Sequence, residues 1–225
     1  MKSEIFSSTK AILVDYYGTL VDVGHPFAEI QQWFTDTYAG FTDNTNCIYM
    51  AFYKEHVRLL CSNEFYLGQV LLMKSYRVSC DKYNIPFYPE VFQKLIIKLF
   101  TQPPAFSGAQ RTIENLRRYF PVLLLTNADN KILYESIKKQ KFEFDYILSS
   151  EDLQCNKPNT QMFLSACKIL NVPVINTLMI GDSLTEDIYS ATSIGMQAIW
   201  INAKKSKETE SVLQLTSICE IEQLL

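Results

Sequence analysis

The sequence predicts an α/β fold in which helices cover both faces of a parallel β-sheet. Five short segments are rich in branched apolar residues, as expected of strands that are buried on both faces. Segments with helical periodicity lie between most of them, and this alternation is typical of a doubly wound sheet. The alternation breaks off between residue 23 and about residue 100, which predicts a second domain inserted after the first strand.

The predicted core elements follow in chain order. The strands are AILVD (11–15), PVLLLTN (121–127), YILSS (146–150), TLMIGD (177–182) and QAIWIN (197–202). Helical patterns occupy residues 108–120, 130–140, 160–170 and 186–195, and each is followed soon by the next predicted strand. Gly195 stands where a glycine commonly ends a helix.

The insertion has helical patterns but no comparable strand. Its predicted helices are residues 26–40, 48–61, 68–84 and 89–100. The stretch TQPPAFSG (101–108), with two prolines and a glycine, marks the return to the core. We therefore expect residues 1–22 and 101–225 to form the core domain and residues 23–100 to form a helical domain.

Composition and charge exclude several classes of protein. With 48% hydrophobic and 20% charged residues and a net charge of −3, the chain is neither disordered nor basic enough to favour nucleic acid. No segment approaches the roughly 18 consecutive apolar residues that cross a bilayer, and no apolar leader precedes the first strand. The six cysteines form no C-x-x-C pair, which fits reduced thiols. We expect a soluble cytoplasmic protein without nucleic-acid or membrane partners.

Polar residues end three of the predicted strands. Asp15 ends the first strand, Thr126 and Asn127 end the second, and Asp182 ends the fourth. The carboxyl ends of parallel strands form the ligand-binding edge of such a sheet, so these side chains should converge. Taken singly, they are ordinary turn or cap residues.

Two further residues complete the set, namely Lys157 at the expected start of a helix and Asp187 one helical turn beyond Asp182. Each alone is an ordinary surface charge. In combination the residues indicate phosphate chemistry. A carboxylate can attack a phosphoryl group, Mg²⁺ prefers hard oxygen ligands such as two carboxylates, and a hydroxyl, an amide and an ammonium can meet the phosphate oxygens.

The ordered motifs DYYGTLVD, LLTN, KP and GDSLTED resemble those of the haloacid dehalogenase superfamily, which consists mostly of phosphohydrolases. The resemblance extends from residue 11 to about residue 202. It implies a Rossmann-like catalytic core with a helical cap after the first motif, a small-molecule substrate and a monomer or homodimer. It also implies roles for particular residues: Asp15 as nucleophile; Thr126 and Lys157 in catalysis and, with Asn127, in phosphate binding; and Asp15, Asp182, Asp187 and the backbone carbonyl of Tyr17 as Mg²⁺ ligands.

Tyr17 departs from the phosphatase pattern, in which a second Asp protonates the leaving group and activates water. Tyrosine, with a pKa of about 10, is a poor base near neutral pH. The L-2-haloacid dehalogenases of the superfamily do carry tyrosine there, and DYYGT matches their form. They use no metal, however, whereas GDSLTED keeps the metal-binding acids of the phosphatase form.

Three functions follow from this conflict. The favoured one is a Mg²⁺-dependent phosphatase with an aspartyl-phosphate intermediate, restricted to good leaving groups or aided by water or a cap residue such as His56. The first alternative is an L-2-haloacid dehalogenase that forms an aspartyl ester without metal. The second is a binding or regulatory protein with weakened catalysis. Aromatic residues of the cap are explained mostly by core packing, with an apolar substrate pocket as the alternative.

Overall fold

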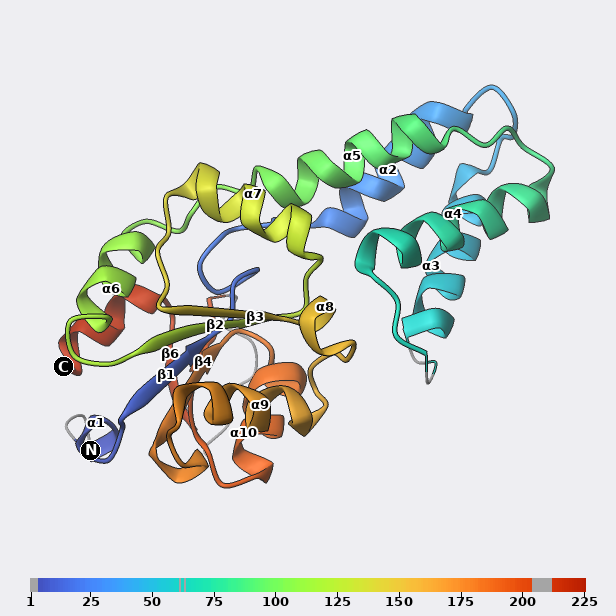
Figure 1. Ribbon diagram of the computed structural model, residues 1–225. Helices are drawn as coiled ribbons and strands as arrows, with labels where there is room; N and C mark the ends of the chain where they lie inside the picture. Colours follow the sequence, from blue (N-terminus) through green and yellow to red (C-terminus); the bar gives the residue numbers. More distant parts are fainter. Residues whose placement is uncertain (1–3, 61, 63, 204–211) are drawn as a thin grey trace. The chain divides into compact units, whose positions relative to one another are not determined.

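The computed structural model describes residues 4–60, 62, 64–203 and 212–225 (Figure 1). The chain divides into two compact units, one composed of Met1–Asp22 with Pro103–Leu225 and the other of Val23–Gln102. Among the described residues, no helix combines the length and the apolar character that a membrane span requires.

The first unit is built on a parallel six-stranded sheet with the strand order β3-β2-β1-β4-β5-β6. The strands are β1 (Ala11–Val14), β2 (Val122–Thr126), β3 (Tyr146–Ser149), β4 (Thr177–Gly181), β5 (Gln197–Ile201) and β6 (Leu213–Leu215). The five predicted strands and the α/β fold class are confirmed. The sixth strand was not predicted, because its three residues are too few to show a pattern.

The faces of this sheet are covered by two sets of helices (Figure 1). Ile12 and Val14 of β1 pack into a core shared with α6 and α7, whereas Leu13 between them packs into a core shared with α9 and α10. This alternation explains why β1 is apolar throughout. The helices of this unit are α1 (Glu4–Ser7), α6 (Ala109–Leu116), α7 (Asn130–Gln140), α8 (Ser150–Leu153), α9 (Thr160–Leu170) and α10 (Tyr189–Ser193).

Shorter helical turns lie at Val174–Asn176 (η1), Leu184–Ile188 (η2) and Ile218–Gln223 (η3). Two details differ from the expectation. The predicted helix 186–195 is divided into the π-helical turn η2 and helix α10, because Ile188 N–H bonds to the Ser183 carbonyl five residues back. Lys157 precedes helix α9 rather than starting it, since Asn159 caps that helix through a bond from Gln161 N–H.

The second unit contains helices α2 (Pro26–Tyr38), α3 (Thr45–Leu60), α4 (Gly68–Tyr83) and α5 (Pro89–Thr101). Its core is aromatic. Phe34, Phe52, Tyr76 and Phe92, one from each helix, are fully buried, and their ring centroids lie 5.3 Å apart for Phe34 and Phe52 and 4.5 Å apart for Tyr76 and Phe92. These aromatic residues therefore stabilise the unit itself.

Candidate active site

A pocket of about 210 Å³ lies at the carboxyl ends of β1, β2 and β4. Residues from separate parts of the chain meet there because β1 lies between β2 and β4 in the sheet. The lining includes all seven residues that the sequence analysis assigned to the site, together with two others: Asp15, Tyr17, Thr126, Asn127, Lys157, Asp182, Asp187, Ser183 and Glu186. Ser183 and Glu186 belong to the GDSLTED motif, but the resemblance implies no role for them.

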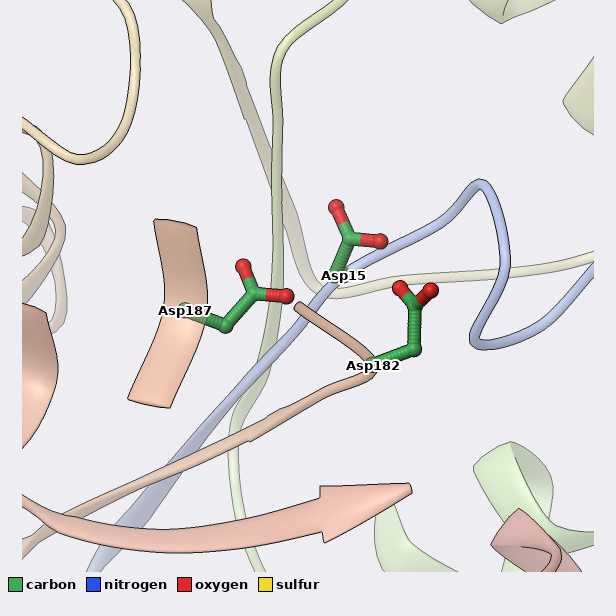
Figure 2. A group of neighbouring side chains, drawn as sticks. All are labelled: Asp15, Asp182 and Asp187. Carbon is green, nitrogen blue, oxygen red and sulfur yellow. The ribbon is translucent and has the colours of Figure 1, made fainter. Parts of the chain in front are cut away.

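Three aspartates of the pocket form a compact cluster (Figure 2). Asp15 follows β1, Asp182 follows β4 and Asp187 lies in η2. Each offers one carboxylate oxygen such that all three oxygens lie within 4.8 Å of one another. Asp15 and Asp187 are buried, with 6% and 1% of their surfaces exposed. Such a cluster gathers hard oxygen atoms, the ligands that a small divalent cation prefers, in one small volume.

Two glycines let the acids approach the main chain. Gly18 has a φ of +93°, and a Cβ there would lie 2.7 Å from Asp182 Cγ. A Cβ on Gly181 would lie 2.6 Å from Asp187 Cβ. Any larger residue at either position would displace a member of the cluster, so the glycines of DYYGT and GDS are steric requirements of this arrangement.

Burial and the charge of Asp15 make the charged states of Asp182 and Asp187 unfavourable. Burial, and then the charge of Asp15, raises the pKa of Asp182 to about 6. Burial raises the pKa of Asp187 to about 7, with Asp15 again adding to the shift and Lys157 opposing it. A cation bound among the carboxylates would relieve both effects. The donor set therefore fits Mg²⁺.

Lys157 supplies the positive charge of the pocket. Its Nζ donates to Asp15 Oδ1 at 2.7 Å and to Asp187 Oδ1 at 2.5 Å, and 3% of the residue is exposed. Burial alone would lower the pKa of this ammonium, but the two carboxylates outweigh burial and raise it. The lysine is therefore charged at neutral pH. Even so, the described lining contains four acids and this one base, so the pocket carries a negative balance.

Thr19 and Asn127 connect these groups. The Thr19 hydroxyl lies 3.2 Å from Asp182 Oδ1 and 3.4 Å from Asp15 Oδ2, so the threonine of DYYGT lies between the two acids. The side-chain amide of Asn127 contacts the main chain of Lys157 and the carboxylate of Glu186. Thr126, at the end of β2, is 1% exposed and lines the pocket beside them.

Tyr17 lines the same pocket, and its ring meets that of Tyr16 in a T-shaped arrangement with 4.9 Å between the ring centroids. Burial raises the pKa of the Tyr17 hydroxyl above the ordinary tyrosine value, and Tyr16, Asp129 and Asp15 add to this shift. The phenol is therefore protonated at any physiological pH and cannot act as a base.

Asp129 is a buried acid near the pocket that the sequence analysis did not single out. It lies in TNADN after β2, at the N-cap position of helix α7, and the sequence there is that of an ordinary helix start.

Comparison with known proteins adds a second line of information. Residues 9–195 match a hydrolase family, described as haloacid dehalogenase-like hydrolase. A glyceraldehyde 3-phosphate phosphatase of Pyrococcus abyssi is 28% identical over 120 residues, which are 52% of this chain and 50% of that protein. An N-acylneuraminate-9-phosphatase of Rattus norvegicus is 32% identical over 93 residues, which are 40% of this chain and 38% of the relative. The matches thus span half or less of the length of these relatives.

Solved structures resemble the chain over nearly its whole length. A dehalogenase crystallised as an intermediate complex superposes with a TM-score of 0.75 at 19% identity and covers 97% of both chains. The magnesium-bound hydrolase YfnB from Bacillus subtilis has a TM-score of 0.74 at 19% identity, over 96% of this chain and 98% of that one. At such identities the likeness establishes the fold.

Proposed function

Because the chain belongs to the haloacid dehalogenase-like hydrolase family, and is therefore a hydrolase, we propose that it is a Mg²⁺-dependent phosphohydrolase of small phosphorylated metabolites. The observation that carries the proposal is the cluster of Asp15, Asp182 and Asp187, whose oxygens lie within 4.8 Å of one another beside Lys157. A dianionic phosphate could not enter a pocket with this surplus of acids unless a cation offset their charge. The phosphatases among the curated relatives support the same class of substrate.

In this proposal Asp15, Asp182, Asp187 and the backbone carbonyl of Tyr17 hold the magnesium ion. Bound there, Mg²⁺ would neutralise phosphate charge and hold the phosphate against the nucleophile. The trio of aspartates, Asp15, Asp182 and Asp187, suits this cation because its donors are carboxylate oxygens. The described lining residues include no sulfur or imidazole ligand.

Asp15 is the proposed nucleophile. One of its carboxylate oxygens bonds to phosphorus while the bond from phosphorus to the leaving oxygen breaks, and the electron pair leaves with that oxygen. Water then attacks the aspartyl phosphate, inorganic phosphate departs and the Asp15 carboxylate is restored. Lys157, held 2.7 Å from Asp15, stabilises the transferred negative charge, and Thr126 contacts a phosphate oxygen from the end of β2.

Tyr17 restricts the leaving group. Its hydroxyl keeps its proton, so the site lacks at this position a carboxyl group that can first protonate an alkoxide and then activate water. We expect the enzyme to prefer substrates whose leaving group departs without protonation, such as acyl phosphates. The second unit, residues 23–102, is the proposed cap that selects among them.

Dehalogenation of L-2-haloacids is the second candidate, and Tyr17 in DYYGT is the observation that favours it. Halide needs no acid when it leaves. The acids Asp182 and Asp187 oppose this candidate, because without a cation they would repel a carboxylate substrate.

A parallel screen separates the two candidates. Phosphate esters, acyl phosphates and L-2-chloropropionate are each incubated with the protein in the presence of Mg²⁺ or a chelator. Phosphate release that the chelator abolishes supports the proposal. Chloride release that is insensitive to the chelator would replace it with dehalogenation.

A further inference from the structure

The side-chain amide of Asn127 makes three contacts that leave it no free donor. Its Nδ2 donates to the Lys157 carbonyl oxygen at 2.9 Å and to Glu186 Oε2 at 3.1 Å. Its Oδ1 accepts from the Lys157 main-chain N–H at 2.8 Å. An amide nitrogen carries two hydrogens, and both are thus engaged.

The orientation of this amide follows from its partners. The Lys157 N–H requires an acceptor, and the Lys157 carbonyl and the Glu186 carboxylate require donors. A flipped amide would place nitrogen against the N–H and oxygen against two oxygens, so all three contacts would become repulsive. The arrangement therefore excludes an amide N–H that is directed at a phosphate.

The hydrogen bonds between the Asn127 side chain and the main chain of Lys157, called here the Asn127 bracket, hold the segment that carries Lys157. Helix α8 ends at Leu153 and helix α9 begins at Thr160, so Lys157 lies outside regular secondary structure. Asn127, directly after the last residue of β2, pairs with both main-chain polar groups of Lys157 much as a neighbouring strand would. With its main chain held in this way, Lys157 extends its ammonium group to Asp15 and Asp187.

From these contacts we propose that Asn127 is a positioning residue, which locks the main chain of Lys157 and does not bind phosphate through its side chain. This replaces the phosphate-binding role that the motif had suggested for the Asn127 side chain. The kinetic consequences of this inference rest on the proposed phosphohydrolase function. The hydrogen bonds of the Asn127 bracket, however, can be tested in the absence of any activity.

The direct test is amide hydrogen exchange at Lys157, whose N–H is readily isolated because Pro158 has none. Asn127→Ala removes the acceptor and should raise the exchange rate of this N–H by about tenfold or more, whereas Glu186→Gln keeps Asn127 and an acceptor oxygen for its Nδ2 and should leave the rate within about threefold of wild type. Unchanged exchange in Asn127→Ala would overturn the proposal. Circular dichroism of both variants confirms that the fold is intact.

The kinetic test is a double-mutant cycle with acetyl phosphate and Mg²⁺. If Asn127 acts through Lys157, then Asn127→Ala lowers kcat by about tenfold or more in the wild-type background and has little further effect in Lys157→Met. Full additivity of the two losses would mean that Asn127 contacts the substrate itself, and the proposal would be wrong. If the wild-type protein has no phosphatase activity, the proposed function is wrong. The hydrogen-exchange result then decides by itself whether Asn127 positions Lys157.

Discussion

Lys157 Nζ lies 2.7 Å from Asp15 Oδ1, and this ion pair joins two residues that are 142 positions apart in the chain. The pair is buried, so neither charge is screened effectively by water. It holds the proposed nucleophile beside a permanent positive charge before any substrate arrives.

Replacing the proposed nucleophile should abolish turnover. Asp15→Asn keeps the shape of the side chain but removes its nucleophilic charge, so we expect hydrolysis of acetyl phosphate to fall by roughly 1000-fold or more. The rate is measured as phosphate release with Mg²⁺ present. Asp43→Asn, an exposed aspartate of the second unit, serves as the control and should match wild type. Near-normal activity of Asp15→Asn would remove Asp15 from the mechanism.

Removing an acid of the trio should weaken metal binding. In Asp182→Asn one of the three clustered carboxylates is neutral, and we expect the affinity for Mg²⁺ in calorimetry to fall by about tenfold or more. Glu186→Gln is the matched control, because Glu186 lines the same pocket outside the trio. Equal Mg²⁺ affinity in wild type and Asp182→Asn would show that the cluster is not the metal site.

Restoring an acid at position 17 should widen the substrate range. Tyr17→Asp introduces a carboxyl group that can protonate a leaving alkoxide, and this kind of catalysis contributes roughly 100-fold to 10,000-fold in enzymes. We expect the ratio of kcat/KM for an alkyl phosphate to that for acetyl phosphate to rise at least about tenfold. Tyr17→Phe, which keeps the ring but not the hydroxyl, should leave this ratio unchanged. If the ratio stays constant in Tyr17→Asp, some other feature limits the leaving group.

The second unit should lose stability in acid through His56. This imidazole contacts the rings of Phe27 and Phe52, and burial lowers its pKa to about 4. Between pH 6.5 and pH 4 the unfolded chain binds a proton that the folded chain does not bind. The free energy of unfolding therefore falls as the pH is lowered through this window.

Urea unfolding at several pH values measures this effect. The decline in stability from pH 7 to pH 4.5 should be shallower in His56→Phe than in wild type, since the variant keeps a ring and loses the titration. His25→Gln, at the exposed second histidine, should follow the wild-type curve. Parallel curves for wild type and His56→Phe would exclude His56 as the source.

The sequence predicted the fold well because the strands are buried on both faces and are uniformly apolar. The bounds of β1 to β5 differ from the predicted ones by at most one residue at either end, and each strand ends one residue before its predicted end. The positions of Asp15, Thr126 and Asp182 at the carboxyl ends of predicted strands also marked them as candidate site residues. A doubly wound sheet places the carboxyl ends of its parallel strands at one edge.

The finer contacts of the pocket depend on main-chain geometry that no pattern encodes. Asn127 and Lys157 are 30 residues apart, and their contacts involve the main chain of a segment without regular structure. The pKa values of Asp182 and Asp187 likewise depend on burial and on the distance to Asp15. Residue types suggested which groups would meet, and only the folded chain defines which of their atoms are engaged.

The pairing of β1 with β4 has a consequence for synthesis of the protein. Asp15 is synthesised before β4 and Asp187, which follow only after the whole of Val23–Gln102 and strands β2 and β3 have been made. A chain that ended before β4 would contain Asp15 and Lys157 but neither Asp182 nor Asp187, so the aspartate cluster could not form. The pocket therefore forms late in translation, and binding of a metal ion there would report that β1 and β4 have met.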